Sequence, residues 1–202
     1  MATATPSPAD SAPTMPVDDD ILYEVVQGQV QEKPGMGAYE AELASLLVAY
    51  LVTFVRDHKL GRAVSEALFQ LDRVQNLQRR PDVAFVSNAR WPFHRNAPKV
   101  AAWDVIPDLA VEVNSPSNKA NDIISKIDEY FRAGVQRVWV IYPNARTVYL
   151  YESPSEVKIL RAGDTLDGAP LLPGFVLPLA TLFGEPEQEQ DQAQEPQGPQ
   201  AG

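Results

Sequence analysis

The chain has 202 residues, two histidines and no cysteine, so it has room for one domain and excludes disulfides, thiolate metal sites and cysteine nucleophiles. Any metal would be held by oxygen ligands, which favours magnesium, manganese or calcium. The net charge of −10 comes mainly from the two ends. Nine of the 27 acids lie in residues 1–20 and 184–202, which hold no Lys or Arg, so residues 21–183 carry 18 acids against 17 basic residues. The local charge pattern of this nearly neutral body decides whether it binds phosphate.

The two ends also differ from the body in composition. Residues 1–17 are rich in Ala, Pro, Ser and Thr, and residues 184–202 in Gln, Glu and Pro. Neither can bury enough apolar surface to fold, which predicts two disordered tails around one domain, 18–183. The N-terminus lacks the basic and apolar regions of a secretory signal, and the longest nearly apolar stretch, 44–55, is too short to span a bilayer. We expect a cytoplasmic protein without membrane contact.

In chain order, the body begins with a β-hairpin around Gln27-Gly28 and continues with a helix whose apolar residues recur at helical spacing. Three strands follow, the second opened by Pro81, and then a helix that ends at Gly134. Two more strands come after it. The expected ranges are 21–32 for the hairpin, 38–61 and 115–134 for the helices, and 62–71, 81–86, 108–113, 136–142 and 146–152 for the strands. This order predicts a compact α/β fold with a crossover connection.

Glu112 is the unusual residue of the third strand, "DLAVEV". Side chains alternate across a strand, so Glu112 shares one face with Asp108, Ala110 and Asn114. A carboxylate at the centre of a buried strand costs several kcal/mol unless it is paired, protonated or bound to a metal. A buried ion pair with an arginine is the main structural alternative to a functional role.

Asp82 is the second candidate, because it opens the neighbouring strand directly after Pro81. Two carboxylates on adjacent strands can share a divalent cation, which removes their mutual repulsion. Taken alone, an Asp after a Pro is more often a turn residue or a strand-end cap. Asp108 follows Pro107 in the same way, and we expect a structural role for it.

Basic residues occur near these carboxylates. Lys126 lies on the flank of the inward stripe formed by Ile123, Ile127 and Tyr130, where a surface lysine with its stem on apolar neighbours is the commoner case. Two loop clusters flank the Asp82 strand, a placement that suits phosphate contact, although solvated loops would show the same pattern. These clusters contain Arg73, Arg79, Arg80, Arg90, Arg95 and Lys99, of which Arg79, Arg80 and Arg95 are the predicted nucleic-acid contacts.

The stretches "RRPDVAFVS", "PDLAVEVNSPSNKANDIISKIDEYFRAGVQRVWVIYP" and "RTVYLYE" resemble the Uma-type restriction endonuclease family, part of the PD-(D/E)XK nuclease superfamily. The resemblance covers about residues 22–183. It implies a restriction-endonuclease-like α/β core of helix, three strands, helix and strand, with an N-terminal β-hairpin and a C-terminal β extension. This is the element order predicted above from the residues themselves.

The same resemblance assigns roles. Asp82 and Glu112 match the acidic residues of the motif, as ligands of Mg²⁺ or Mn²⁺. The motif lysine falls on Asn114, so the sequence departs from the pattern there, and Lys126 on the following helix matches a substitute lysine. Glu40 matches a further metal-binding acid of the first helix, and Glu42 matches less well. A metal-dependent endonuclease that cleaves DNA, without a small-molecule cofactor and as a homodimer that cuts both strands, is the implied function. The alternative is a non-catalytic nuclease-fold protein that acts as a nucleic-acid or protein interaction module.

Overall fold

The computed structural model describes residues 21–115 and 120–184. The predicted tails lie outside these residues except for Gly184, as does Lys119. The elements, in order, are β1 (Tyr23–Val26), β2 (Gln29–Glu32), α1 (Ala38–Asp57), β3 (Gly61–Ser65), β4 (Leu68–Asp72), β5 (Leu77–Arg79), β6 (Val83–Ser87), β7 (Ala102–Trp103), β8 (Leu109–Val113), α2 (Ala120–Ala133), β9 (Arg137–Tyr142), β10 (Thr147–Ser153), β11 (Glu156–Arg161), β12 (Thr165–Asp167), β13 (Val176–Pro178) and α3 (Leu179–Phe183).

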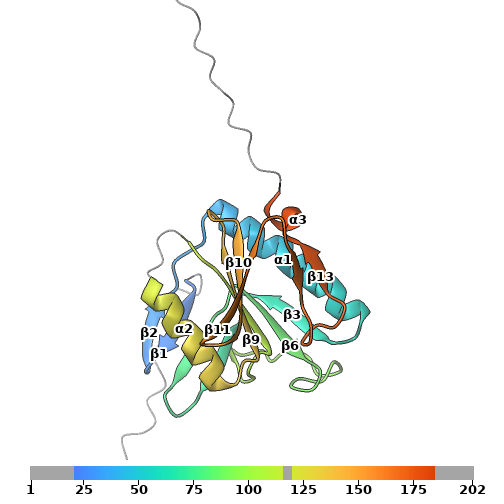
Figure 1. Ribbon diagram of the computed structural model, residues 1–202. Coiled ribbons are helices and arrows are strands. Elements are labelled where there is room, and N and C mark those ends of the chain that lie inside the picture. The colour runs from blue at the N-terminus through green and yellow to red at the C-terminus, as the bar shows by residue number, and fades with distance from the viewer. Residues whose placement is uncertain (1–20, 116–119, 185–202) are drawn as a thin grey trace, which may run out of the picture.

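A six-stranded sheet in the order β11-β10-β9-β8-β6-β3 forms the centre of the molecule (Figure 1). Strands β3, β6 and β8 pair antiparallel, whereas β8 and β9 pair parallel and are joined through α2. A parallel pair needs such a crossover because the chain must return to the same end of the sheet. The predicted core of helix, three strands, helix and strand is therefore α1, β3, β6, β8, α2 and β9.

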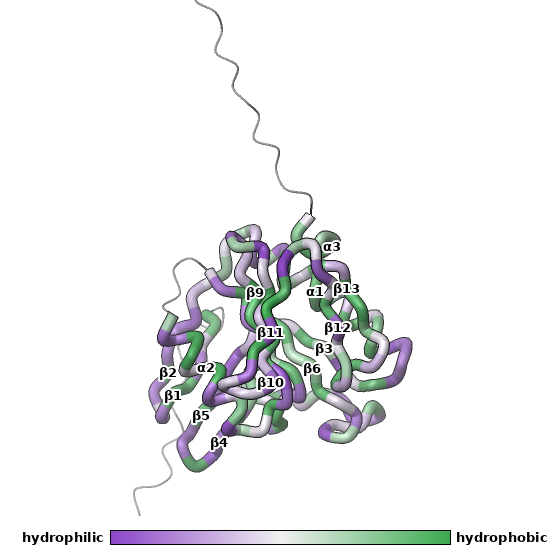
Figure 2. Tube along the Cα trace, viewed as in Figure 1, coloured by the Kyte–Doolittle hydropathy of each residue, from purple (hydrophilic) through white to green (hydrophobic). Residues whose placement is uncertain are grey.

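Alternation of side chains along β8 divides the hydrophobic core into two halves. Leu109, Val111 and Val113 pack on one side with the buried face of α1, and Ala110 packs on the other with Tyr130 of α2. Figure 2 shows hydrophobic residues in the strands between these helices. The sheet is thus covered on both faces, which explains why β8 is apolar on both sides apart from Glu112.

The N-terminal hairpin forms as predicted. Gln27 and Gly28 both have positive φ, at 52° and 75°, as a tight two-residue hairpin turn of the type that favours glycine requires. Strand β1 joins a second, five-stranded sheet in the order β2-β1-β5-β4-β7. In Figure 1 this hairpin lies beside α2.

The predicted single strand 62–71 is wrong in one respect, because the structure divides it into β3 and β4 of different sheets. The chain turns at Glu66, whose φ is 47°, and the backbone N–H of Glu66 donates to the carbonyl of Asp82 at 3.1 Å. A propensity pattern does not reveal this corner, since both halves are rich in strand-forming residues. The corner brings Glu66 next to Asp82.

The C-terminal part extends the fold as the resemblance implies. Strands β10 and β11 continue the large sheet, and β12 pairs with β13 before α3, which lies beside α1 (Figure 1). Helix α1 has a length and composition compatible with a membrane span. Its apolar stripe, however, is buried in the core at Leu43, Leu47, Leu51 and Val55.

Candidate metal and nuclease site

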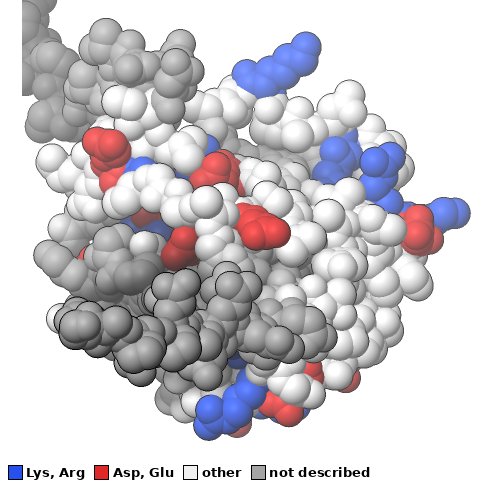
Figure 3. Space-filling view, turned by 90° about the horizontal axis from the view of Figure 1, so that it is seen from above, with Lys and Arg blue, Asp and Glu red and all other residues white. Residues whose placement is uncertain are grey.

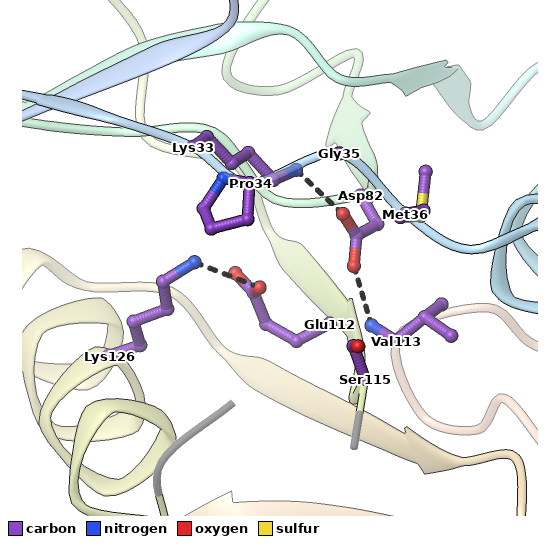
Figure 4. A pocket seen from close by; sticks show the side chains of 9 residues that line it. All are labelled: Lys33, Pro34, Gly35, Met36, Asp82, Glu112, Val113, Ser115 and Lys126. Carbon is purple, nitrogen blue, oxygen red and sulfur yellow. Dashed lines mark hydrogen bonds and ion pairs between the residues drawn. The ribbon is translucent and has the colours of Figure 1, made fainter. Parts of the chain in front are cut away.

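The antiparallel register of β6 and β8 brings the two predicted carboxylates together. Val83 pairs with Val111, and one further step along both strands places Asp82 opposite Glu112. Both side chains are buried, with 3% and 4% of their surface exposed. They line a cavity of about 50 Å³ (Figure 4), together with Lys33, Pro34, Gly35, Met36, Val113, Ser115 and Lys126.

One carboxylate oxygen of Asp82 accepts a hydrogen bond from the backbone, and the other accepts one from a lysine. The backbone N–H of Val113 donates to Oδ2 at 2.6 Å, which ties the end of β8 to the start of β6. The ammonium of Lys33 donates to Oδ1 at 2.6 Å. Asp82 is therefore a fully partnered, buried carboxylate, which is the condition under which burial of a charge is tolerated.

Glu112 is partnered from the opposite direction, by helix α2. The hydroxyl of Tyr130 donates to Oε1 at 2.6 Å, and the ammonium of Lys126 donates to Oε2 at 3.0 Å. Burial raises the pKa of Glu112, and the nearby charge of Lys126 opposes this rise. The sequence left open a buried ion pair between Glu112 and an arginine. In the structure the partner of Glu112 is instead Lys126, the lysine that the resemblance assigns to catalysis.

Lys126 reaches Glu112 because it precedes Tyr130 by four residues, so both side chains leave the same face of α2. Its ammonium also lies 3.2 Å from a carboxylate oxygen of Glu24 on β1. Burial disfavours the charged form, but the carboxylates of Glu112 and Glu24 outweigh this effect and raise the pKa of Lys126. Lys126 thus stays protonated and can act as a positive charge, not as a base.

Arg79, one of the predicted nucleic-acid contacts, lies in the interior between β1 and α2. Its guanidinium is buried and forms ion pairs with Glu24 and Glu129, both at 2.6 Å. These two ion pairs connect β1 to α2. Because the guanidinium is buried and paired on both sides, its position argues against direct contact with nucleic acid. Sequence alone could not distinguish it from Arg80, because the pairing depends on the distant hairpin.

The other two predicted nucleic-acid contacts differ from each other. The guanidinium of Arg80 is half-buried and donates to the backbone carbonyls of Tyr23 and Glu66, at 3.1 and 2.5 Å. Arg95 is exposed and lies over the ring of Trp91, 3.7 Å from its centre. Arg95 can therefore still reach a phosphate, whereas Arg80 would first have to release backbone partners.

Glu40 is not brought to the pocket. It lies buried in the first turn of α1, with its carboxylate folded back against Gly37, and it is not among the residues that line the cavity. Within residues 21–115 and 120–184, no group of three or more acidic or histidine side chains is placed to hold a metal ion. Of the residues that the structure describes, Asp82 and Glu112 are the carboxylates that line the cavity.

Sequence reasoning missed Lys33 and Glu24. Both come from the hairpin, and nothing in its local pattern indicates that it packs against α2 and the start of β6. Asp108, by contrast, has the structural role expected: it accepts hydrogen bonds from the backbone N–H of Ser87 and the side chain of Gln136, both at 2.6 Å, and pairs with Arg90.

A larger cleft of about 690 Å³ adjoins the cavity between the hairpin and α2, and shares Lys33, Pro34 and Lys126 with it. The residues that line this cleft carry both signs of charge, with Glu24, Glu32, Asp122 and Glu129 as the acids and Lys33, Arg79 and Lys126 as the basic residues. Figure 3 shows the molecule from above; on the described part of this face, Lys and Arg form separate groups and no continuous basic band.

A six-stranded mixed sheet with α1 on one face and α2 on the other, and with paired carboxylates at the ends of two adjacent strands, defines a restriction-endonuclease-like α/β fold. The sequence comparisons give the family: residues 10–180 match the Uma2 family, described as "Putative restriction endonuclease", and the chain belongs to this family. Family and fold together indicate a nuclease of the restriction-endonuclease type.

One solved structure supports the fold. A "putative nuclease belonging to DUF820" from Anabaena variabilis superposes with a TM-score of 0.70, at 20% sequence identity, over 80% of this chain and 89% of that chain. Among curated proteins, no sequence matches the chain.

Proposed function

We propose that the protein is a divalent-metal-dependent endonuclease that hydrolyses DNA phosphodiester bonds at the Asp82–Glu112 cavity. The observation that carries this proposal is the cavity itself, which is lined by two buried carboxylates from adjacent strands and by Lys126, whose raised pKa keeps its ammonium protonated at neutral pH (Figure 4). A structural ion pair needs no cavity. A site that binds a cation and an anionic group needs carboxylates, a cation and open space together.

The charge balance around the cavity supports a divalent ion. The ion pairs form two networks, and each has one more carboxylate than cation, so the pair carries a net charge of −2. One network consists of Lys33, Glu66 and Asp82; the other consists of Glu24, Arg79, Glu112, Lys126 and Glu129. The guanidinium of Arg80 interacts with Glu24 and Glu66 and offsets part of this excess. A divalent cation would neutralise the remainder, which is favourable because uncompensated buried charge is costly.

The donor set fits Mg²⁺ or Mn²⁺. Asp82 and Glu112 would hold the ion through oxygen atoms, and a cavity of about 50 Å³ leaves room for several waters, since one water needs about 10–15 Å³. Mg²⁺ typically binds to one or two carboxylates and keeps most of its waters. When bound, such an ion supplies Lewis acidity toward a phosphate and activates a water.

The chain's own residues prepare the remaining chemistry. The hydroxyl of Tyr130 holds the Glu112 carboxylate in one orientation, and burial keeps that hydroxyl protonated by raising the pKa of Tyr130. The ammonium of Lys126 places a positive charge next to Glu112, where it can stabilise negative charge that develops on a phosphodiester. In this proposal Lys126 replaces the lysine missing at Asn114.

DNA would be held mainly outside the cavity. Exposed Arg95 and half-buried Arg80 are the proposed contacts with the phosphate backbone, and a homodimer would place two cavities on the two strands of a duplex. Glu40 would contribute to the metal only if the start of α1 moved toward the cavity.

The alternative, a non-catalytic interaction module, is favoured by one observation: each of the two carboxylates already has a lysine partner. The two functions separate in a cleavage assay on supercoiled and linear DNA with Mg²⁺, Mn²⁺ or EDTA. We expect metal-dependent cleavage by the parent protein and by Glu156→Gln, an exposed control on β11, and none by Glu112→Gln. Cleavage that survives in Glu112→Gln, or that is absent in the parent at every metal, would overturn the nuclease proposal.

A further inference from the structure

We infer that Lys33 is a stand-in cation of this site: its ammonium holds the place of the divalent ion on Asp82 and leaves for Glu66 when the ion binds. The inference rests on the proposed metal site at Asp82 and Glu112. It assigns a role to a residue that neither the motif nor the local sequence singles out. It also explains how a site built for a cation is stable without one.

The position of Lys33 places its ammonium inside the site. Lys33 directly follows β2, and its backbone N–H donates to the carbonyl of Leu22 at 2.8 Å, which fixes the start of the side chain. The side chain is 8% exposed and ends 2.6 Å from Oδ1 of Asp82. Figure 4 shows it pointing toward Asp82, whereas Lys126 points toward Glu112 from helix α2.

Lys33 and a divalent ion would compete for Asp82 because of the hydrogen bonds that Asp82 already accepts. Its Oδ2 accepts the backbone N–H of Val113 at 2.6 Å, a bond that fastens β8 to β6. Oδ1 is the oxygen that takes no part in this link, and an ion that binds there meets the ammonium of Lys33. An ammonium and a divalent ion on one oxygen repel each other, so the ammonium must withdraw.

Glu66 offers the ammonium of Lys33 a second carboxylate partner. Its carboxylate lies 3.6 Å from Nζ of Lys33, at the corner between β3 and β4, and is 32% exposed. Lys126 shows the same arrangement, because Glu24 at 3.2 Å is a second partner besides Glu112. Each lysine can therefore yield a carboxylate to the ion without becoming an unpaired buried charge, which would be strongly unfavourable.

This arrangement predicts opposite effects for two substitutions. Lys33→Met removes the competing cation, so Mn²⁺ should bind about tenfold more tightly than to the parent. Glu66→Gln removes the second partner, so the ammonium stays on Asp82 and Mn²⁺ should bind about threefold more weakly. Lys99→Met and Glu156→Gln, at exposed positions away from the cavity, should leave the affinity unchanged.

The test is calorimetric titration of the full chain with Mn²⁺, together with the melting temperature with and without Mn²⁺. Because Lys33→Met leaves Asp82 unpaired, it should melt lower than the parent in EDTA and gain more from Mn²⁺; Lys33→Gln, which keeps a donor, should fall between them. Equal or weaker Mn²⁺ binding by Lys33→Met, with parental binding abolished by Glu112→Gln, would overturn this inference and leave the proposed metal site standing. Absence of Mn²⁺ binding in both parent and Lys33→Met would overturn both.

Discussion

Replacement of Glu112 by alanine should destabilise the metal-free protein, although a lone buried carboxylate is normally a liability. The substitution takes the acceptor from the buried hydroxyl of Tyr130 and one of two carboxylates from Lys126. Loss of one member of a buried pair costs about 3–5 kcal/mol, and an unsatisfied buried donor about 1–3 kcal/mol. Lys126 keeps Glu24 at 3.2 Å, and the burial cost of Glu112 itself disappears, which together reduce the loss.

We therefore expect the free energy of unfolding to fall by about 3 kcal/mol, a large effect for one substitution. For a domain of this size, each kcal/mol lowers Tm by roughly 2–4 °C, so Tm should fall by about 6–12 °C. The assay is thermal unfolding followed by circular dichroism at neutral pH in EDTA. Glu156→Ala, at an exposed position of β11, is the matched control and should change Tm by no more than about 2 °C.

The same variants separate the two roles of Glu112. Added Mn²⁺ should raise the Tm of the parent and of Glu156→Ala but not of Glu112→Ala, because only a folded site that binds the ion is stabilised by it. A fall in Tm as small as that of the control would show that Tyr130 and Lys126 find other partners at no cost, and would refute the reasoning from burial.

Three further predictions concern the same groups. Lys126→Met should reduce DNA cleavage ~100-fold or more, since a preorganised charge near the reacting phosphate is lost, yet keep Mn²⁺ binding by calorimetry; adding Asn114→Lys should restore part of the activity, and unimpaired cleavage by Lys126→Met would contradict its role. Tyr130→Phe should lower the free energy of unfolding by about 1–2 kcal/mol in urea, and an unchanged midpoint would show that the hydroxyl contributes nothing. The pKa of Glu112 is raised above its ordinary value of 4.5, so the part of metal-free stability that comes from protonation of Glu112 is fully present below pH 4.5 and is lost as the pH rises through the raised pKa. Mn²⁺ affinity should change in the opposite direction and strengthen with pH over this range, because the ion binds the ionised carboxylate; parallel pH profiles for the parent and Glu112→Gln would contradict the shift.

The sequence was sufficient for the core of the fold and for the meeting of Asp82 with Glu112. Strand alternation put Glu112 on the face opposite Leu109 and Val111, and helical spacing put Lys126 beside the inward Tyr130. These patterns are local and have fixed periods. The antiparallel pairing of β6 and β8 then needed only one consistent register to bring the carboxylates together.

The features of the site and fold that the sequence did not predict depend on contacts between distant segments. Lys33 reaches Asp82 across 49 positions of sequence, and Arg79 reaches Glu24 across 55, and no periodic pattern encodes such pairs. The corner at Glu66 was hidden for a similar reason, because both flanking segments favour strands. A basic residue in a loop cluster looks the same whether it faces solvent, as Arg95 does, or a buried carboxylate, as Arg79 does.

The central claim is that Asp82 and Glu112 hold a divalent cation in the cavity they line. An anomalous difference map from crystals soaked in Mn²⁺ tests it most directly, since the signal locates the ion independently of any activity. We predict one strong peak between the carboxylates of Asp82 and Glu112, with Lys33 displaced from Asp82 toward Glu66. Crystals soaked in saturating Mn²⁺ that show no peak in the cavity, with Lys33 and Lys126 still paired to the two carboxylates, would contradict the claim.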